Sequence, residues 1–408
     1  MNRDGRLLLA ARVVRSCASG FFGVSLAIYL NLLGYSGVLI GIALTASLVG
    51  SASFTILASF LERRYGRKRI LILFVFLSTT AGIIFILSTN YAELIFATCI
   101  GTISYTGSAG GGGPFLSVEQ AIIPQTVSAE RRTLAYATFN TGARLATSLG
   151  ALLIGVPPLL ETSGLNAVDS FRVIFSLSIA ATFSTLFFFN ALSKETEVVT
   201  SGSQENRGPM LSQESKRRIG KLATLMGLDS FGTGFIIQSI ASLWFFTKFG
   251  ASLSSLSLIF FASGIASTVC FILAARIANA IGLINTMVFT HLPSNIIMIL
   301  IPFAPTLSLA TTMYVVRGFL STMDIAPRQS YIAAIVKPEE RVAAASFTNV
   351  SSNVSQAISP SFAGYFLQFV ATLSFPFIIG GALKSAYDVI LFFSFRALKT
   401  PEEIQKKI

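Results

Sequence analysis

Long uninterrupted apolar stretches recur along the entire sequence. Twelve of them approach about 20 residues, the length that an α-helix needs to cross the hydrocarbon core of a bilayer. The chain is therefore predicted to be an all-α polytopic membrane protein with twelve transmembrane helices, and the lipid bilayer is its first partner. The predicted spans are residues 8–33, 38–60, 70–88, 92–123, 134–157, 171–192, 222–246, 253–277, 284–303, 307–335, 343–370 and 375–396.

The composition excludes several other classes of protein. Of the 408 residues, 53% are hydrophobic and only 12% are charged, whereas soluble domains carry about 25% charged residues. A water-soluble globular protein is therefore excluded. One His and three Cys are too few for a disulfide scaffold or a zinc cluster, so we expect no metal and no other cofactor.

Two stretches depart from the apolar pattern. Residues 193–221 are rich in Ser, Glu, Gln, Lys and Arg, a composition that cannot bury a core. We predict a flexible cytoplasmic linker here, between an N-terminal six-helix bundle (1–192) and a C-terminal six-helix bundle (222–397). Residues 398–408 are predicted to form a cytoplasmic tail. The glycine-rich residues 107–113 are predicted to interrupt or bend the fourth helix.

The basic residues are distributed unevenly among the loops. The chain holds 30 Lys and Arg against 18 Asp and Glu. If the N-terminus is cytoplasmic, most of the basic residues fall in cytoplasmic loops, and Arg172 and Lys248 fall on the other side. This asymmetry follows the positive-inside rule and predicts a multi-pass protein of the plasma membrane with both termini cytoplasmic. A nucleic-acid partner would require basic residues and interleaved aromatic residues on a folded surface, whereas these charges form loop clusters, so we expect no nucleic-acid partner.

The two predicted halves repeat each other weakly. A shift of 209 residues, with small gaps, aligns residues 127–132 with residues 336–341. Two six-helix bundles of the same orientation constitute a parallel repeat, which some transporter folds use. Other matched pairs are Gln120 with Gln329, Asn140 with Asn349, Gly20 with Gly234 and Gly66 with Gly282.

The loop after the second predicted span reads SFLERRYGRKR. With it, the whole chain resembles the major facilitator superfamily, whose pattern here is a small residue, three residues, an acid, a base, one residue, Gly and two bases. Gly66, Arg67 and Lys68 fit this pattern. Arg63 occupies the position of the acid and Glu62 lies one residue earlier, so the cytoplasmic latch that the acid forms in the family is in question. Positive-inside anchoring is the alternative role for this basic run.

Two further signatures of that family are displaced or incomplete. The Arg that precedes a Gly in its fourth helix is Ile100 here, and the tenth span instead carries Arg317 before Gly318. The antiporter pattern Gly-x-x-x-Gly-Pro has only a loose counterpart around Gly150 and Gly155. The resemblance implies two bundles around a central cavity, transport by alternating access, a monomer and no enzymatic activity.

Charged residues inside the predicted spans carry the functional hypothesis. A charge at mid-membrane costs at least about 2.5–3.5 kcal/mol, so it should face a cavity or a partner. By the resemblance, the first, fourth, seventh and tenth helices line the central path. Arg15 and Asp229 occupy matching positions in the first and seventh spans, and we expect them to meet across the two halves as a coupling gate. Local pairing within each half is the alternative.

Other intramembrane polar residues are candidates for substrate binding. Arg144 and Arg317 lie near the midplane of their spans. Glu119 is a possible partner for Arg144, and Glu119 and Gln120 are expected to face the central path. Asp324 follows Arg317 by seven residues and so shares its helix face.

Several charges are expected to pair locally. Asp324 lies four residues before Arg328, with which it can pair on one helix face. Lys384 and Asp388 have the same spacing and are interpreted as a self-neutralising structural pair. His291 lies in the ninth span, which is peripheral in the family, so we expect it to pack or to form hydrogen bonds.

These observations favour a secondary transporter that moves a small solute. No nucleotide-binding motif is present, so the expected driving force is an ion gradient. Protons are favoured, because a carboxylate that loses an Arg partner changes its proton affinity. The 36 Phe residues suit an apolar lining and proton-coupled efflux, as by an antiporter, of small amphipathic molecules. The alternative is import or exchange of a small organic anion held by Arg144 and Arg317.

Two other classes were weighed. An intramembrane aspartyl protease would need a Gly-x-Gly-Asp motif, but Met226 replaces the first Gly before Asp229. A channel or a non-transporting sensor stays open, and substrate-saturable uptake into proteoliposomes would separate a carrier from either.

Overall fold

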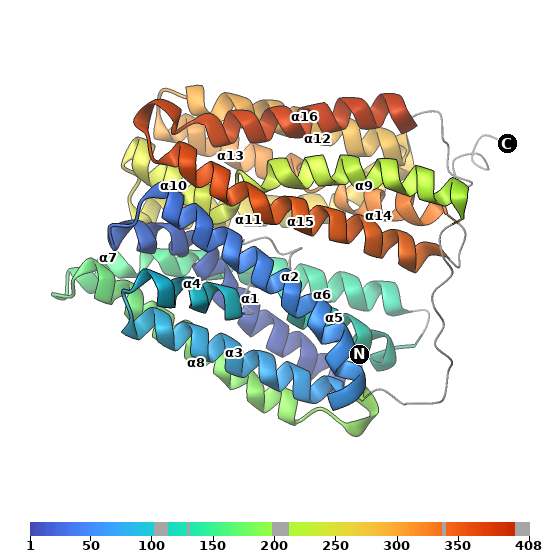
Figure 1. Ribbon diagram of the computed structural model, residues 1–408, viewed down its shortest axis with the longest axis horizontal. Coiled ribbons are helices and arrows are strands. Elements are labelled where there is room, and N and C mark those ends of the chain that lie inside the picture. Colours follow the sequence, from blue (N-terminus) through green and yellow to red (C-terminus); the bar gives the residue numbers. More distant parts are fainter. Residues whose placement is uncertain (102–112, 129–130, 198–211, 337–339, 396–408) are drawn as a thin grey trace. The chain divides into compact units, whose positions relative to one another are not determined.

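The computed structural model describes residues 1–101, 113–128, 131–197, 212–336 and 340–395. Residues 198–211 of the predicted linker, the predicted tail and the glycine-rich residues 107–112 of the fourth span lie outside these ranges. Every regular element within them is helical (Figure 1). The helices of the first half are α1 (Arg3–Leu32), α2 (Gly37–Tyr65), α3 (Arg67–Leu87), α4 (Tyr91–Ile100), α5 (Gly113–Ile122), α6 (Arg132–Ala151), α7 (Pro157–Glu161) and α8 (Ala167–Asn190).

The second half continues with helices of similar length. In both halves, short 3₁₀ turns join several elements, among them η1 (Ile123–Thr126), η3 (Leu152–Gly155), η4 (Lys194–Thr196), η5 (Ile301–Phe303) and η7 (Val370–Thr372). The α-helices of this half are α9 (Gln213–Gly234), α10 (Gln238–Phe249), α11 (Leu253–Ile281), α12 (Leu283–Leu300), α13 (Leu307–Leu320), α14 (Ile325–Ala334), α15 (Arg341–Leu367) and α16 (Phe375–Phe395).

Eight helical stretches of the described residues are long and apolar enough to cross a membrane. Of the other predicted spans, the seventh is interrupted between α9 and α10, and the tenth between α13 and α14. The fourth span is divided between α4 and α5, and the eleventh is α15, a continuous helix rich in Ser and Asn. In the seventh and tenth spans the interruption shortens the continuous apolar helix, and in the eleventh the Ser and Asn residues of α15 lower the hydropathy.

The two halves share an unusual turn. Gly66, between α2 and α3, has φ +87° and ψ 151°. Gly282, between α11 and α12, has φ +89° and ψ 162°. Glycine adopts positive φ without the steric cost that a Cβ brings. The same turn at the pair of glycines that the sequence repeat aligns supports the parallel repeat.

The chain forms two compact units. Unit 1 comprises residues 1–200, 237–264 and 360–370, and unit 2 comprises residues 201–236, 265–359 and 371–408. Two segments of the predicted second half therefore pack with the first half. They contain α10 with the start of α11, and the end of α15.

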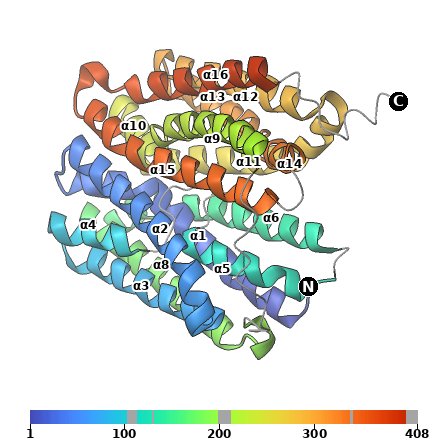
Figure 2. The ribbon, with the colours of Figure 1, turned by 45° about the vertical axis from the view of Figure 1, so that its right-hand side comes forward.

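Unit 1 is built around α1. This helix packs against α6 and α8, and α3 lies beside α8 in both ribbon views (Figures 1 and 2). Gly20 of α1 and Gly150 of α6 make the crossing of α1 and α6 close, since a Cβ on either would overlap the backbone of the other helix. Stacked and edge-on rings fill the core next to it, with Phe22 and Phe175 at 4.9 Å between centroids.

Unit 2 is built around α16. This helix packs against α12 and α9, and α12 lies beside it in both ribbon views (Figures 1 and 2). Gly232 of α9 and Gly380 of α16 allow close approach, because a Cβ on either would lie within 3 Å of the other's carbonyl oxygen. Tyr331, Tyr387 and Leu391 are fully or almost fully buried in the apolar core of this unit.

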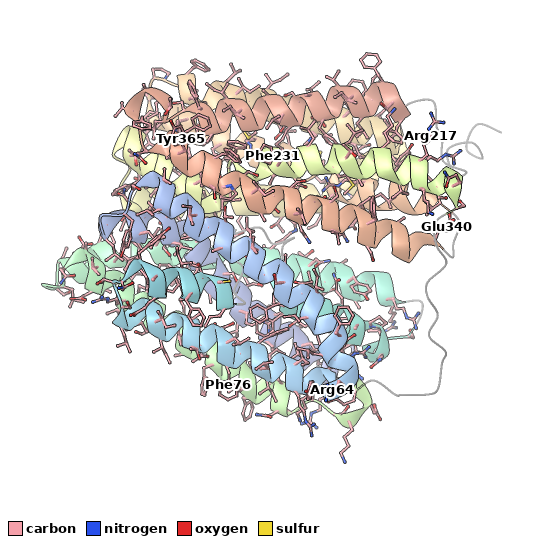
Figure 3. The ribbon with its side chains drawn as sticks, viewed as in Figure 1. Arg64, Phe76, Arg217, Phe231, Glu340 and Tyr365 are labelled. Atoms are coloured by element: carbon pink, nitrogen blue, oxygen red, sulfur yellow. The ribbon has the colours of Figure 1, made fainter. Side chains whose placement is uncertain are left out.

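The outer helix faces and helix ends differ in polarity. Phe76 projects from α3, and half of its surface is exposed (Figure 3). Arg217 and Glu340 lie at one end of unit 2, where the Glu340 carboxylate accepts hydrogen bonds from the backbone of Ser212 and the hydroxyl of Ser215 (Figure 3). Apolar side faces and polar ends are what a bilayer requires of a bundle of helices.

Candidate functional site

A buried charge cluster in unit 1 joins α1 to α5. Arg15 forms an ion pair with Glu119, and a guanidinium nitrogen of Arg12 lies 3.6 Å from the same carboxylate. The Glu119 side chain is completely buried. The Arg15 guanidinium also lies 4.0 Å from the centroid of the Phe115 ring, a distance that allows a cation–π contact.

This cluster gives Arg15 a partner inside its own unit. Local pairing was the alternative to a pair with Asp229 across the two halves, and the structure shows it for both residues. Glu119, which the sequence suggested as a partner for Arg144, pairs with Arg12 and Arg15. The three charges of this cluster carry one excess positive charge.

The remaining candidates of unit 1, Arg144 and Gln120, differ from each other in exposure. Arg144 is buried in α6, and its backbone carbonyl accepts a hydrogen bond from Ser148. The Gln120 side chain is exposed, and its backbone carbonyl accepts a hydrogen bond from the Tyr136 hydroxyl. Neighbouring positions on α5 thus place Glu119 inside the unit and Gln120 at its surface.

Asp229 of α9 is the centre of a larger cluster in unit 2. Its carboxylate accepts a 2.6 Å hydrogen bond from Lys384 Nζ of α16 and lies 3.2 Å from Arg328 Nη1 of α14. Lys384 also donates to the Thr233 hydroxyl at 2.8 Å. The Asp229 and Lys384 side chains are each less than one tenth exposed. Two cations therefore share one buried carboxylate.

Arg328 extends this cluster to Asp324. The two side chains lie 3.4 Å apart, which confirms the predicted pair four residues apart. Asp324 is buried at the start of α14, after the interruption that separates α14 from α13. Because the tenth span is interrupted, Arg317 and Asp324 do not lie on one continuous helix, and the shared helix face that their spacing suggested is not formed.

His291 of α12 forms the other part of the unit 2 cluster. Its Nδ1 lies 2.9 Å and 3.1 Å from the two carboxylate oxygens of Asp388 on α16. Asn295 Nδ2 donates to the same carboxylate at 2.8 Å. The predicted hydrogen-bonding role of His291 is confirmed. The predicted Lys384–Asp388 pair is wrong, because Lys384 binds Asp229 and Asp388 binds His291.

Arg317 lies within a predicted span, and its described contacts are not carboxylates. Its Nε lies 3.1 Å from the sulfur of Met298 on α12, and its guanidinium lies 5.8 Å from the ring centroid of Tyr314. Arg317 as a whole is partly exposed. The side chain therefore keeps hydrogen-bonding capacity for another group.

The basic loop after α2 is fixed to the end of α8 and to η4. The backbone N–H of Arg67 donates to the Glu197 carboxylate at 2.7 Å. Lys68 Nζ donates to the carbonyl of Asn190 at 2.6 Å. A Cβ at Gly66 would lie 2.5 Å from Glu197, so this turn needs glycine for space as well as for its φ.

Glu62 also contributes to this loop. Its carboxylate lies 3.6 Å from Arg67 Nε, while the side chain of Arg63 lies outside the described part of the chain. Glu197, a residue that sequence reasoning did not select, makes the strongest acidic contact with the loop. Glu197 was not selected because it lies after η4, in a stretch that was predicted to be a flexible linker.

Unit 1 also contains a contact of its two segments from the second half with α1 and α2. The Ser239 hydroxyl of α10 donates to the carbonyl of Gly23 at 2.7 Å, and the Ser242 hydroxyl donates to the carbonyl of Val24 at 2.6 Å. All these groups are buried. Two serine hydroxyls thus hold α10 to backbone carbonyls in the second part of α1.

Small residues hold α2 to the end of α15. A Cβ at Gly37 would overlap the backbone of Gly364, and a Cβ at Gly41 would overlap the carbonyl of Pro360. The hydroxyls of Thr45 and Ser361 lie 2.8 Å apart. We call the α1–α10 and α2–α15 contacts together the small-residue clamp.

Both halves of the chain match one known protein family. Residues 8–219 and 222–407 match the family model Major Facilitator Superfamily. An uncharacterized membrane protein of Saccharomyces cerevisiae, YJR124C, is 25% identical over 421 residues, which cover 96% of this chain and 93% of the yeast protein.

Solved transporter structures share the fold. The inward-open xylose transporter XylE from E. coli has a TM-score of 0.73 at 14% identity and covers 98% of both chains. The nucleoside transporter NupG has a TM-score of 0.71 at 15% identity, covering 97% of this chain and 99% of its own. A peptide transporter, POT, bound to sulfate has a TM-score of 0.75 at 14% identity, covering 97% and 95%. At such low identity the likeness concerns the fold.

Proposed function

Because the chain belongs to the major facilitator superfamily, and is a multi-pass membrane transporter and not an enzyme, we propose that it moves a small amphipathic solute by proton-coupled alternating access. The observation that supports proton coupling is the buried cluster around Asp229. Three carboxylates and two cations of unit 2 lie on or next to α9, α14 and α16, and all of them are buried except Arg328, whose side chain is 19% exposed. A buried group of charges that can gain or lose a proton is a common device for linking an ion gradient to movement.

The proposed orientation places both termini in the cytoplasm of a plasma-membrane protein. The basic loop at Arg67 and Lys68 is then cytoplasmic, in agreement with the positive-inside rule. The small-residue clamp involves the second part of α1 and the first turns of α2, so it belongs to the external side. We propose that the protein works as a monomer.

Efflux of amphipathic molecules is the proposed direction. Both Arg residues of the unit 1 cluster are engaged with Glu119 and with aromatic rings, which leaves that cluster poorly suited to hold an organic anion. Aromatic side chains recognise amphipathic solutes through large apolar faces with few directional demands. This combination favours weakly specified apolar or cationic substrates.

Arg317 supports the second candidate function, transport of a small organic anion. Its described contacts are Met298 and Tyr314, and neither neutralises its charge. A guanidinium presents a fork of N–H donors that suits a carboxylate or phosphate. Under this alternative, Arg317 binds the anionic group of the substrate.

Thermal stability of the purified protein distinguishes the two functions. A ligand that binds only the folded state raises the melting temperature, so lipophilic cations and small carboxylates or phosphates would be compared at about pH 5.5 and 7.5. Ligands that stabilise the protein are then tested in proteoliposomes that contain a trapped pH-sensitive dye. The proposal expects stabilisation by a cation or a neutral amphiphile, and a change of internal pH when that ligand moves.

Two variants refine this test. Asp229→Asn should remove the proton movement, whereas Asp169→Asn, an exposed carboxylate paired with Arg172, should leave it unchanged. If only anions stabilise the protein and Arg317→Ala abolishes the shift, the anion carrier replaces the proposed exporter. Substrate movement without any proton movement overturns proton coupling itself.

A further inference from the structure

We propose that His291 and Asp388 form the proton-binding site of this transporter. The inference rests on the proposed proton coupling and assigns it to a pair of residues in α12 and α16. Sequence reasoning gave His291 only a packing or hydrogen-bonding role, because the ninth helix is peripheral in the family. The structure instead connects this residue to Asp229.

Nδ1 of His291 faces both carboxylate oxygens of Asp388, at 2.9 Å and 3.1 Å. The Asp388 residue is fully buried. An ionised carboxylate accepts hydrogen bonds and donates none. The proton on the neutral imidazole therefore resides on Nδ1, held by Asp388, and Nε2 is the nitrogen that is open to protonation.

The other ring nitrogen of His291, Nε2, lies 3.9 Å from a carboxylate oxygen of Asp229. A protonated Nε2 is attracted to this carboxylate, whereas an unprotonated Nε2 directs a lone pair toward it. The imidazolium form is thus flanked by two carboxylates from two different helices, α9 and α16.

Other charged and titratable groups also lie near the imidazole ring. Lys384 on α16 opposes protonation, but its ammonium group is bound to Asp229 at 2.6 Å. Arg328 on α14 divides its charge between Asp229 and Asp324. The Tyr387 ring packs edge-on against the imidazole at 6.1 Å, and Asn295 contributes an uncharged amide.

The charge balance of the cluster depends on this one proton. The carboxylates of Asp229, Asp324 and Asp388 outnumber the cations of Arg328 and Lys384 by one. A buried uncompensated charge is strongly unfavourable. Protonation of His291 brings the linked group to neutrality, and loss of the proton leaves one negative charge in the interior of unit 2.

The test uses the fact that His291 is the single histidine of the chain. Full-length protein with ¹³C,¹⁵N-labelled histidine, purified with a tag that contains no histidine, is reconstituted in lipid nanodiscs. The ¹⁵N shifts of its imidazole report the protonation of each ring nitrogen directly. The protein is titrated between about pH 5 and 8, the range in which histidine changes its charge.

The expected result is a transition between a neutral imidazole with its proton on Nδ1 and an imidazolium. Asp388→Asn should reduce the protonated fraction at about pH 6 by about tenfold, because a carboxylate next to the ring stabilises its charged form. Asp169→Asn is the matched control and should leave the titration unchanged. A ring that stays neutral over the whole range in the unaltered protein overturns the proposal, as does an unchanged titration in folded Asp388→Asn.

The failure of this inference differs from failure of the proposed function. If His291 titrates as expected but vesicles show no proton movement with substrate, the site stands and the proposed coupling is wrong. If proton movement accompanies transport and persists in His291→Gln, the coupling stands and the assignment of the proton to His291 is wrong.

Discussion

Lys384 and Asp229 form a direct ion pair between α16 and α9, with 2.6 Å between the ammonium nitrogen and the carboxylate oxygen. The pair lies next to the close approach of Gly232 and Gly380, and a Cβ at Gly232 would lie 2.8 Å from the Lys384 side chain. The two helices are therefore held by small residues and by a buried charge pair at the same level.

Lys384→Met should destabilise the protein by about 3–5 kcal/mol, because removal of one partner leaves a buried charge without full compensation. The measurement is the unfolding of the purified protein in mild detergent. Lys384→Met combined with Asp229→Asn should be less destabilised than the sum of the two single variants, since the two residues act on each other.

The control for this prediction is the exposed pair of Arg172 and Asp169, whose side chains are 26% and 44% exposed. Arg172→Met should cost only about 0–1 kcal/mol, as exposed ion pairs do. Equal losses for Lys384→Met and Arg172→Met would contradict the view that the unit 2 pair is buried.

Glu119→Gln should lower the melting temperature clearly. The substitution removes the carboxylate that compensates Arg12 and Arg15 and leaves two buried cations close together. A second change, Arg15→Met, should restore part of the lost stability by removing one of these cations. Glu119→Gln with unaltered stability would show that the two Arg residues find other compensation.

Thr45→Cys and Ser361→Cys should form a disulfide on mild oxidation. The native hydroxyls lie 2.8 Å apart, which brings the two Cβ atoms near the separation that a disulfide needs. The natural cysteines are first replaced by serine, and free thiols are counted by alkylation and mass spectrometry. Reaction only under denaturing conditions would contradict the contact of α2 with the end of α15.

The same assay tests the glycine at this contact. Gly41→Leu should slow cross-linking strongly, because its side chain would overlap the carbonyl of Pro360. Gly220→Leu is the matched control, since a Cβ at Gly220 has open space around it. Equal cross-linking in the two variants would show that α2 and α15 do not depend on the small side chain.

Ser239→Ala and Ser242→Ala should each weaken the hold of α10 on α1. A hydrogen bond between helices in a membrane contributes about 0.6 kcal/mol, which corresponds to about a threefold change in an equilibrium constant. The double variant should therefore populate the state in which α10 is separated from α1 about tenfold more. The measurement is faster thiol labelling of Val24→Cys in a protein without its natural cysteines. Unchanged labelling in the double variant would show that these bonds do not hold the two helices.

The fold was largely predictable from the apolar stretches. Their length predicted the helices, and a set of weak matches between the halves, Gly66 with Gly282 among them, predicted the repeat. The interruptions after Gly234 and Leu320 were missed, because hydropathy over a whole span does not distinguish a continuous helix from two short ones. Apolar residues continue after Gly234, whereas the short polar stretch after Leu320 is enclosed by apolar residues on both sides. The turns there depend on tertiary contacts that lie far away in the sequence.

The charge clusters were predictable only in part. Asp324 and Arg328 pair at 3.4 Å, as their spacing predicts, although Asp229 of α9 lies closer to Arg328, at 3.2 Å. Lys384 and Asp388 have the same spacing but separate, because each meets a carboxylate or an imidazole on a neighbouring helix. Local spacing identifies which residues can pair, whereas helix packing decides which of them do.

The close crossing of α1 and α6 has a consequence for the surrounding lipid. At 1.5 Å per residue, the 30 residues of α1 extend about 45 Å, well beyond a hydrocarbon core of about 30 Å, so the helix must tilt or protrude. Because Gly20 and Gly150 bring the two backbones into contact, no acyl chain can enter between them and α6 must share the tilt of α1. A thinner bilayer therefore inclines both helices together, and bilayer thickness becomes a physical variable to which this transporter responds.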